Sequence, residues 1–312
     1  MSRLASLDLG TNTFRLLIAD FSDGRTLTPL LRKRVITRLG EGFHKDGSIQ
    51  PQAADRAGKA LLSFSTILDD YQVEQIFAVA TSVVREAANG ETITHNLYKQ
   101  TGLPIRTLTG IEEAHLTLKG VFSVLQDTAK LSLVVDIGGG STELILSEDT
   151  LPIQTDSINL GVVHLAEQLI TSDPPSEHNL SLLHEQIRKS LSANSAAQYL
   201  AACSPSQSPL SLIGTAGTVT TLAAMDQRLT DYDPLKINNY PLARTSLETM
   251  YTQLTTLPLS ERTAIPGLEK GREDLIIPGT AILIEIMNRF QCTDIITSDA
   301  GLLEGVLLEH HT

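Results

Sequence analysis

The sequence predicts an α/β protein with two domains, each built on a mixed β-sheet. Its 312 residues exceed the length at which one hydrophobic core usually stops growing. A strand, turn and strand pattern occurs twice without a gap, as LDLGTNTFRLLI at 7–18 and as VDIGGGSTELIL at 135–146. Segments with strand and helix periodicity alternate around these two copies, which is typical of mixed sheets covered by helices. We therefore expect a first domain at 1–120 and a second at 121–298.

The elements of the first domain follow in chain order. After the first copy, alternating apolar and polar residues predict a further strand at 30–42. Apolar residues at helical spacing predict a helix at 51–71, and the apolar run IFAVAT predicts a strand at 76–81. The segment IEEAHLTLKGVFSVLQD that follows Gly110 has a helical pattern and leads to the second copy. It should therefore join the two domains.

The second domain continues with units of strand, turn and helix. Two such units are predicted at 210–225 and at 295–310, each with a helix that begins at a strand end. Residues 171–179 and 203–211 are rich in Pro, Ser and Asn and predict loops.

Composition narrows the class of protein. Hydrophobic residues make up 41% of the chain and charged residues 19%, as expected for a globular protein. The formal charge of −12 argues against broad binding to nucleic acid or to an anionic membrane, so a polyanionic substrate must meet a local cationic site or a metal ion. Cys203 and Cys292 lack disulfide or zinc spacing. With neither a signal peptide nor a membrane span recognisable, we expect a cytoplasmic protein.

The turns of the two copies predict phosphate binding. They combine glycine with small hydroxyl or amide residues, and a tight turn of this kind exposes a nest of backbone N–H donors. An ordinary glycine-rich hairpin is the alternative, but the repetition of the whole unit favours an anion site. The candidate residues are Gly10, Thr11, Asn12 and Thr13 in the first turn, and Gly138, Gly139, Gly140, Ser141 and Thr142 in the second.

The strand-end acids Asp8 and Asp136 occupy equivalent places before the two turns. If the turns face each other across a central cleft, they can hold a polyphosphate from both sides while both acids reach a metal ion between them. Phosphoryl chemistry is therefore the leading hypothesis.

A third anion site is predicted in GTAGTVTT. Gly214, Thr215 and Gly217 belong to a small-residue turn, and the N–H groups of the helix that follows can bind an anion. A capped helix start, with Thr215 or Thr218 as N-cap, is the alternative.

Several charged residues have two interpretations. Glu113 begins the joining helix together with Glu112, where the helix dipole alone favours acids, yet a phosphatase needs a carboxylate to orient its water, and Glu113 is the candidate. Arg15 follows the first turn and could contact phosphate or face solvent. Arg85 could clamp a phosphate or form only a surface ion pair.

Arg272 lies in GLEKGREDLIIPG. It could bind phosphate, or it could lie on the solvated face of a helix that Pro278 would kink.

These residues lie in segments that resemble one family. Eight segments, in order along nearly the whole chain, resemble the exopolyphosphatase and guanosine-pentaphosphate phosphohydrolase family. They are LDLGTNTFRLLIAD, RLGEG, ATSVVREAANG, LTGIEEAHLTLKGV, VVDIGGGSTELIL, LIGTAGTVTTLAAM, GLEKGREDLIIPGTAIL and SDAGLLEGVL. The resemblance implies the two-lobed fold of actin, hexokinase and the chaperone ATPases, with a five-stranded mixed sheet in each lobe and residues from about 299 to 312 returning to the first lobe.

The resemblance also implies Mg²⁺-dependent hydrolysis of a terminal phosphoanhydride. Glu113 matches the family's catalytic base. The metal-site acids are Asp136 and Glu143, which match the family, and Asp8. Positions that meet phosphates in the family are matched by Arg15, Arg85 and Arg272.

The chain departs from the family pattern at Leu303 and at His164, where Arg is common. It resembles the short, two-domain branch of the family, which favours short polyphosphates over long ones. We expect an exopolyphosphatase. Guanosine pentaphosphate (pppGpp) hydrolysis is an alternative that the sequence does not separate, and a non-enzymatic sensor of (p)ppGpp or another nucleotide is a rival of a different class. Whether the protein forms a homodimer stays open.

Overall fold

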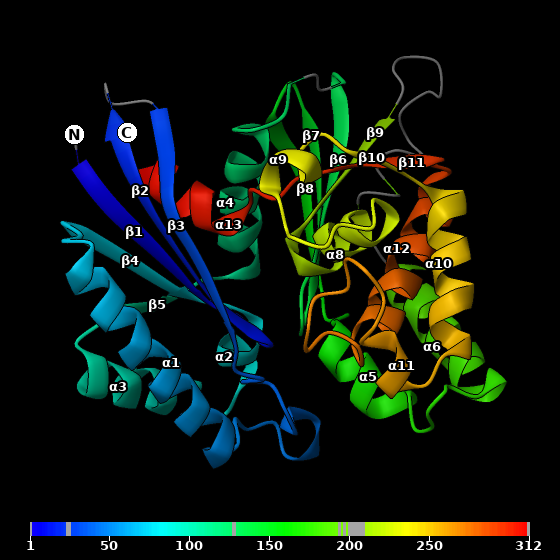
Figure 1. The fold of residues 1–312 in the computed structure, drawn as a ribbon, viewed down its shortest axis with the longest axis horizontal. Helices are drawn as coiled ribbons and strands as arrows, with labels where there is room; N and C mark the ends of the chain where they lie inside the picture. The colour runs from blue at the N-terminus through cyan, green and yellow to red at the C-terminus, as the bar shows by residue number, and fades with distance from the viewer. Residues whose placement is uncertain are drawn as a thin grey trace. The chain divides into compact units, whose positions relative to one another are not determined.

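The computed structural model describes residues 2–22, 26–126, 129–192, 195, 198 and 210–310 (Figure 1). Contacts divide the chain into two compact units. Unit 1 comprises Met1–Gly120 and Gly301–Thr312, and unit 2 comprises Val121–Ala300. Each unit is built on its own sheet.

Unit 1 begins with a three-stranded meander and continues with alternating helices and strands. Its strands are β1 Ser2–Leu9, β2 Thr13–Ser22, β3 Thr26–Ile36, β4 Gln75–Ala80 and β5 Ile105–Thr107. Its helices are the 3₁₀ helix η1 Phe43–Lys45, then α1 Pro51–Asp70, α2 Ser82–Glu86, α3 Gly90–Thr101, α4 Gly110–Phe122, which continues into unit 2, and α13 Leu302–His310.

The sheet of unit 1 is mixed, with the order β3-β2-β1-β4-β5. The first three strands pair antiparallel, and β1, β4 and β5 pair parallel. Carboxyl ends of parallel strands lie at one edge of a sheet, so the segments that follow β1, β4 and β5 share that edge.

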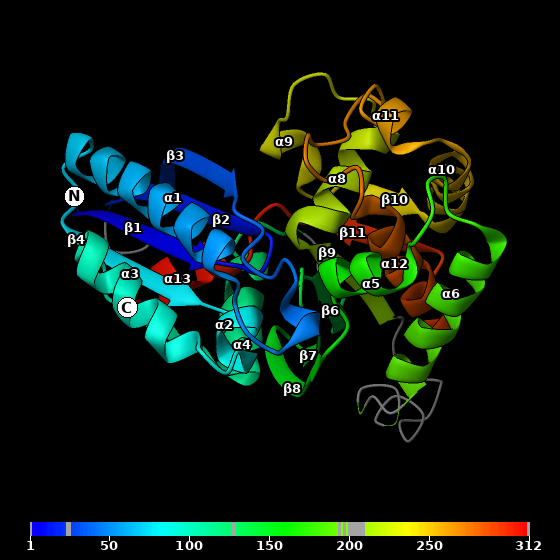
Figure 2. The ribbon, with the colours of Figure 1, turned by 90° about the horizontal axis from the view of Figure 1, so that it is seen from below.

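Alternate residues of β1 face opposite sides of this sheet. Leu7 and Leu9 pack in the core formed with α1 and α3, whereas Leu4 packs against Leu303 and Leu307 of α13. Helix α4 covers the same side as α13. Figure 2 shows α1 and α3 lying over the strands.

Unit 2 repeats this plan. Its strands are β6 Leu131–Ile137, β7 Thr142–Glu148, β8 Leu151–Ile158, β9 Leu210–Thr215, β10 Pro241–Ala243 and β11 Asp294–Thr297. Its helices are α5 Val162–Leu169, α6 Glu177–Ser192, α8 Ala216–Asp226, α9 Pro234–Ile237, α10 Arg244–Thr256, α11 Leu259–Arg262 and α12 Ile276–Phe290. The strand order is β10-β11-β9-β6-β7-β8.

The core of unit 2 lies between this sheet and its helices. Val135 and Leu144 of the sheet belong to it. The helices α5, α6, α8, α10 and α12 contribute Leu165, Leu183, Leu222, Leu247 and Ile282. Because side chains alternate along a strand, Asp136 and Glu143 lie on the other side of the sheet.

The predicted α/β class with two mixed sheets is confirmed, and the five-stranded sheet is correct for unit 1. Five strands are wrong for unit 2, because β10 adds a sixth strand at the edge beside β11. This strand has three residues, which are too few for a visible periodicity, and its Pro241 is tolerated at an edge.

The bounds of two predicted elements need correction. The strand predicted at 30–42 ends at Ile36, because Thr37 and Arg38 donate their N–H groups to Asn12 rather than to β2. The loop predicted at 171–179 ends earlier, since α6 begins at Glu177.

Pro278 kinks no helix, because it lies in the first turn of α12, where a proline removes no helical hydrogen bond. Cys203 and most of the loop predicted at 203–211 lie outside the described residues. Among the described helices, none combines the length and apolarity that crossing a membrane requires.

Candidate functional site

The first turn joins β1 to β2, and its carbonyl groups are held by the loop after β3. Gly40 donates its N–H to the Thr11 carbonyl over 2.8 Å, and Thr37 and Arg38 donate to the Asn12 carbonyl over 3.0 and 2.9 Å. Within the described part of the chain, the N–H groups of Thr11 and Asn12 have no protein acceptor. The turn therefore offers donors that suit an anion.

The second turn joins β6 to β7 and has the same arrangement. Here the first turn of α5 holds the carbonyls: Val162 donates to Gly138 over 3.1 Å and Val163 donates to Gly139 over 2.9 Å. The N–H groups of Gly139 and Ser141 have no acceptor among the described protein residues. Both predicted turns thus have occupied carbonyls and available N–H groups.

A glycine supports each turn from behind. A Cβ atom on Gly40 would lie 2.4 Å from the Cγ2 atom of Thr11, and one on Gly161 would lie 2.3 Å from the backbone of the second turn. Each glycine follows a buried leucine, Leu39 or Leu160. The repeat therefore extends beyond the two hairpins.

The hairpins differ in the charges of one cross-strand pair, the pair that contains the strand-end acid. Asp8 pairs with Arg15, whose Nε and Nη2 atoms lie 2.8 and 2.7 Å from the Oδ2 atom of Asp8. Oδ1 of Asp8 is buried and has no hydrogen-bond partner among the residues that the structure describes. In unit 2 Asp136 pairs with Glu143, so two buried carboxylates are neighbours, and Ser157 donates to the Oε1 atom of Glu143 over 2.9 Å.

The two acids at the start of α4 have different roles. Glu112 forms a capping box: its carboxylate accepts from the N–H and the hydroxyl of Thr109, which lowers its pKa. Glu113 is 8% exposed, and its Oε2 atom accepts from the Nη1 atom of Arg85 over 3.0 Å. The helix-dipole explanation therefore suits Glu112, while Glu113 is held by a cation.

Only one nitrogen atom of the Arg85 guanidinium donates hydrogen bonds to described residues. Its Nη1 atom also donates to the Leu108 carbonyl over 3.0 Å, while its Nε and Nη2 atoms have no acceptor among the described residues. Its neighbour Glu86 has a pKa raised by burial. Arg85 can thus hold Glu113 and still contact an anion.

The predicted third anion site is the start of α8, but its geometry differs from the prediction. Gly214 lies in β9 and Gly217 in α8, and the residue with left-handed backbone is Ala216, with φ 64°. Such a conformation costs a non-glycine residue about 1 kcal/mol or more, and strain of this kind is common at functional sites. Thr215 is the N-cap residue of α8, but its side chain does not cap the helix, because its hydroxyl donates to the Ala300 carbonyl.

Arg272 lies against this helix start. A Cβ atom on Gly217 would come within 2.1 Å of the Nη2 atom of Arg272, so the glycine makes room for the guanidinium. Arg272 is 11% exposed and pairs with Glu269 through Nε, while Nη1 and Nη2 have no acceptor among the described residues. The alternative of a solvated helix face is wrong, since the side chain is largely buried and the residue precedes α12. A cation beside a helix N-terminus is unfavourable unless an anion joins them.

Each unit gathers its candidates at one sheet edge. In unit 1, Leu9 pairs with Ala80 at the parallel ends of β1 and β4, and Thr11 bonds Ser82 over 2.9 Å. In unit 2, the pairing of β6 with β9 sets Asp136 beside Thr215, so the second turn and α8 begin together. That the two turns face each other across a central cleft stays a prediction.

Sequence reasoning missed four residues of these sites. Glu269 partners Arg272, Ser82 bonds the first turn, and Gly40 and Gly161 support the turns. A leucine–glycine dipeptide stands at both glycines, so their repetition was a usable signal. The other two contacts join segments far apart in the chain, and no spacing reports them.

The oxygen atoms of Asp8, Asp136 and Glu143 show whether these residues suit a metal ion. Among the described residues, no three or more His, Cys, Asp or Glu side chains gather as a metal site. Mg²⁺, however, keeps several waters and takes one or two carboxylates together with substrate phosphates. The neighbouring carboxylates of Asp136 and Glu143 fit that ion, and so does Oδ1 of Asp8, which has no partner in the described part of the chain.

Comparison with known proteins identifies the family. The model of the Ppx/GppA phosphatase family matches residues 17–312. The chain belongs to the Ppx/GppA phosphatase family. This membership confirms the resemblance and the predicted enzyme class, a phosphoanhydride hydrolase.

Three proteins similar to this Ppx/GppA protein match it over nearly their full length. Exopolyphosphatase 2 of Mycobacterium tuberculosis is 30% identical over 99% of this chain and 98% of its own. The crystal structure of an exopolyphosphatase from Cytophaga hutchinsonii has a TM-score of 0.90 at 28% identity, covering 99% of this chain and 98% of that one. The Aquifex aeolicus family member has a TM-score of 0.79 at 28% identity, with 99% and 97% covered. These likenesses confirm the predicted fold class.

The two departures from the family pattern lie in different surroundings. Leu303 is buried and packs with Leu4 and Leu17 of the first sheet, where an apolar side chain suits the site. His164 lies in the first turn of α5, the helix whose N–H groups hold the second turn.

Proposed function

We propose that this Ppx/GppA phosphatase hydrolyses the terminal phosphoanhydride of inorganic polyphosphate, with a preference for short chains. The observation that carries the proposal is the pair of related turns in which the N–H groups of Thr11, Asn12, Gly139 and Ser141 have no acceptor among the described protein residues. Support also comes from the relatives named exopolyphosphatase and from the resemblance to the two-domain branch.

Phosphate binding is assigned to the turns and to three arginines. The residues of the turns are Gly10, Thr11, Asn12 and Thr13 in unit 1, and Gly138, Gly139, Gly140, Ser141 and Thr142 in unit 2. The N–H groups of Thr11, Asn12, Gly139 and Ser141 are the proposed donors, whereas the Gly138 N–H donates to the Ser141 carbonyl and the Thr142 hydroxyl donates to the Leu160 carbonyl. The start of α8 adds Gly214, Thr215 and Gly217. The guanidinium groups of Arg15, Arg85 and Arg272 supply charge-assisted hydrogen bonds, because polyphosphate oxygens are strong acceptors.

Glu113 is proposed as the general base. It accepts a proton from water while the water oxygen attacks the terminal phosphorus, and the bond from that phosphorus to the bridging oxygen breaks. The electrons of that bond leave with the shortened chain, and inorganic phosphate is released. Arg85 orients Glu113 through the 3.0 Å contact between Nη1 and Oε2.

Mg²⁺ is the proposed cofactor, held by Asp136 and Glu143, with Asp8 contributing through Oδ1 directly or through water. When bound, the ion neutralises phosphate charge that builds up during transfer. Asp8 is the weakest of the three ligands, since Arg15 already occupies its Oδ2 atom.

Initial rates on tripolyphosphate, long polyphosphate and pppGpp, compared side by side with and without EDTA, test the proposal. We expect phosphate release from tripolyphosphate to be fastest and to stop in EDTA. Faster release from pppGpp would favour the guanosine-pentaphosphate alternative. Tight (p)ppGpp binding without hydrolysis of any substrate would favour a sensor. A cytoplasmic location and a homodimer stay predictions.

A further inference from the structure

Arg262 is a buried charge that the proposed reaction does not use. It ends the short helix α11 in unit 2 and is 2% exposed. Burial lowers the pKa of its guanidinium. A charged group is retained in a protein interior only where hydrogen bonds and an opposite charge compensate for lost hydration. The contacts of Arg262 therefore indicate what it holds.

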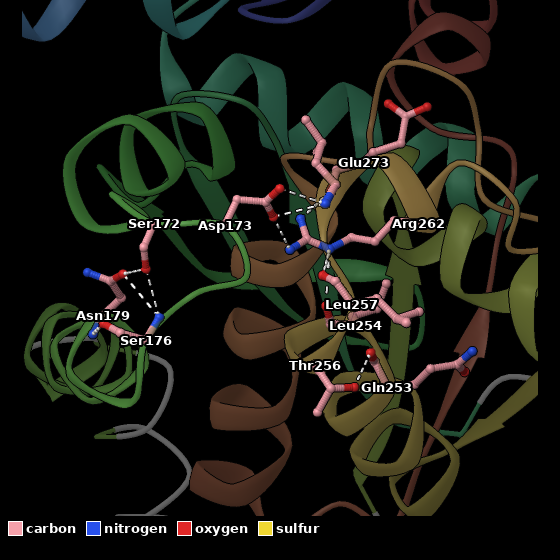
Figure 3. Close-up of polar contacts among 11 residues, drawn as sticks. Ser172, Asp173, Ser176, Asn179, Gln253, Leu254, Thr256, Leu257, Arg262 and Glu273 are labelled. Atoms are coloured by element: carbon pink, nitrogen blue, oxygen red, sulfur yellow. Dashed lines mark hydrogen bonds and ion pairs between the residues drawn. The ribbon is translucent and has the colours of Figure 1, made fainter.

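The guanidinium joins three segments of unit 2 (Figure 3). Nε donates to the carbonyls of Leu254 and Leu257 at the end of α10, both over 3.1 Å. Nη2 lies 3.1 Å from Oδ1 of Asp173, in the loop between α5 and α6. Nη1 donates to the Glu273 carbonyl over 3.1 Å. This fork of donors is a property of arginine that lysine lacks.

The partner carboxylate is itself fixed. Asp173 accepts the N–H of Leu259, at the start of α11, over 2.9 and 2.8 Å. The neighbouring hydroxyl of Ser172 donates to Asn179 in α6 over 2.8 Å and accepts the N–H of Ser176 (Figure 3). Arg262 is thus anchored to the helical layer of unit 2, and the Glu273 carbonyl is the part of the next loop that it reaches.

Glu273 directly follows Arg272 in the chain. Its carboxylate accepts the N–H of Gly271 over 2.8 Å, and Gly271 has a left-handed φ of 85°. The N–H of Arg272 donates to the Glu269 carbonyl over 3.1 Å. The backbone on both sides of Arg272 is therefore fixed, and one of these contacts comes from Arg262.

We propose that Arg262, paired with Asp173, is a positioning residue that holds the guanidinium of Arg272 against Gly217 at the start of α8. It touches no substrate and acts only through the loop that carries Arg272. The inference rests on the proposed function of Arg272 as a phosphate ligand.

A double-mutant cycle with Arg272 tests the inference, read by calorimetric binding of inorganic tripolyphosphate. Arg262→Lys keeps the charge and loses the fork, so we expect affinity to fall about tenfold. In the Arg272→Ala background the same change should have no further effect. Leu183→Ala, a core deletion in the same unit, is the control for general destabilisation. It should bind normally at temperatures where circular dichroism shows it folded.

Asp173→Asn provides a second variant if Arg262→Lys fails to fold. It keeps the guanidinium and should give a smaller loss that also vanishes without Arg272. Unchanged affinity, or an equal loss in both backgrounds, overturns the inference. A wild-type protein that binds tripolyphosphate but releases no phosphate refutes the proposed reaction and still allows the cycle to be measured. A wild-type protein that binds none counts against both.

Discussion

The two hairpins share a strand order, a turn and a supporting glycine, yet they differ in the charges of the cross-strand pair that contains the strand-end acid. The first sets Asp8 opposite Arg15, and the second sets Asp136 opposite Glu143. Opposite charges across a strand pair stabilise a sheet, and like charges destabilise it. The first hairpin is therefore neutral by itself, while the second gains most from a cation. The duplicated backbone offers the same N–H donors twice, but its charges have diverged.

The units also differ in the charged groups that surround each turn. Unit 1 adds the ion pair of Arg85 and Glu113, and unit 2 adds Arg272 at a helix start. Under the proposed function, unit 1 supplies the base and the weakest metal ligand, Asp8, and unit 2 supplies the other two metal ligands, Asp136 and Glu143. Each variant below changes a residue of one unit and tests the role proposed for that unit.

The largest effect is expected at Glu113. The change Glu113→Gln preserves shape and removes the base, so turnover should fall by about 10²- to 10⁴-fold. Tripolyphosphate affinity should change little, because the turns and arginines remain. Phosphate-release rates and calorimetry measure the two quantities.

Glu112→Gln is the matched control, one residue away on the same helix. Its side chain is 43% exposed and caps α4, so activity at neutral pH should stay near the wild-type value. Near-normal turnover in Glu113→Gln would remove unit 1 as the source of the base.

Glu143 tests the second hairpin. Glu143→Gln leaves one carboxylate in the pair, and Mg²⁺ affinity, titrated in the presence of inorganic phosphate, should fall by at least about tenfold. Glu148→Gln, at the exposed end of the same strand, is the control. If both variants bind Mg²⁺ equally well, the like-charged pair is not the metal site.

Gly217 tests the cation of unit 2 without touching a charge. In Gly217→Ala the new Cβ must displace the flexible end of Arg272, so KM for tripolyphosphate should rise about tenfold, with a smaller change in kcat. Alanine is the better helix former by roughly 0.5–1 kcal/mol, so the unfolding midpoint should hold or rise. A variant that is both less stable and unchanged in KM would contradict this role.

Local pattern explains what could be read from the sequence. Both hairpins, α1 and the strand-to-helix units were visible because periodicity and turn chemistry are properties of neighbouring residues. The strand-end acids Asp8 and Asp136 could be aligned for the same reason. The two acids have different cross-strand partners because one aligned position holds Arg15 in the first copy and Glu143 in the second. The alignment alone did not show what this difference in charge does.

Features that depend on tertiary contacts could not be predicted from the sequence. The end of β3 is set by hydrogen bonds to Asn12, and the place of Arg272 is set by space over Gly217. Neither leaves a periodic trace. The left-handed Ala216 runs against local preference, so only the surrounding structure can specify it.

The smallest effect is expected from acid titration of Glu112, the neighbour of the proposed base. Hydrogen bonds from Thr109 lower its pKa in the folded state, so the ionised cap stabilises α4 fully above the ordinary glutamate pKa and less as the pH falls. The wild type should exceed Glu112→Gln in unfolding free energy at pH 7 by less than about 1 kcal/mol, because the site is exposed. That difference should shrink below about pH 4.3. Urea unfolding at several pH values measures it, and a difference that stays constant to pH 3 would mean that the carboxylate charge contributes nothing to the cap.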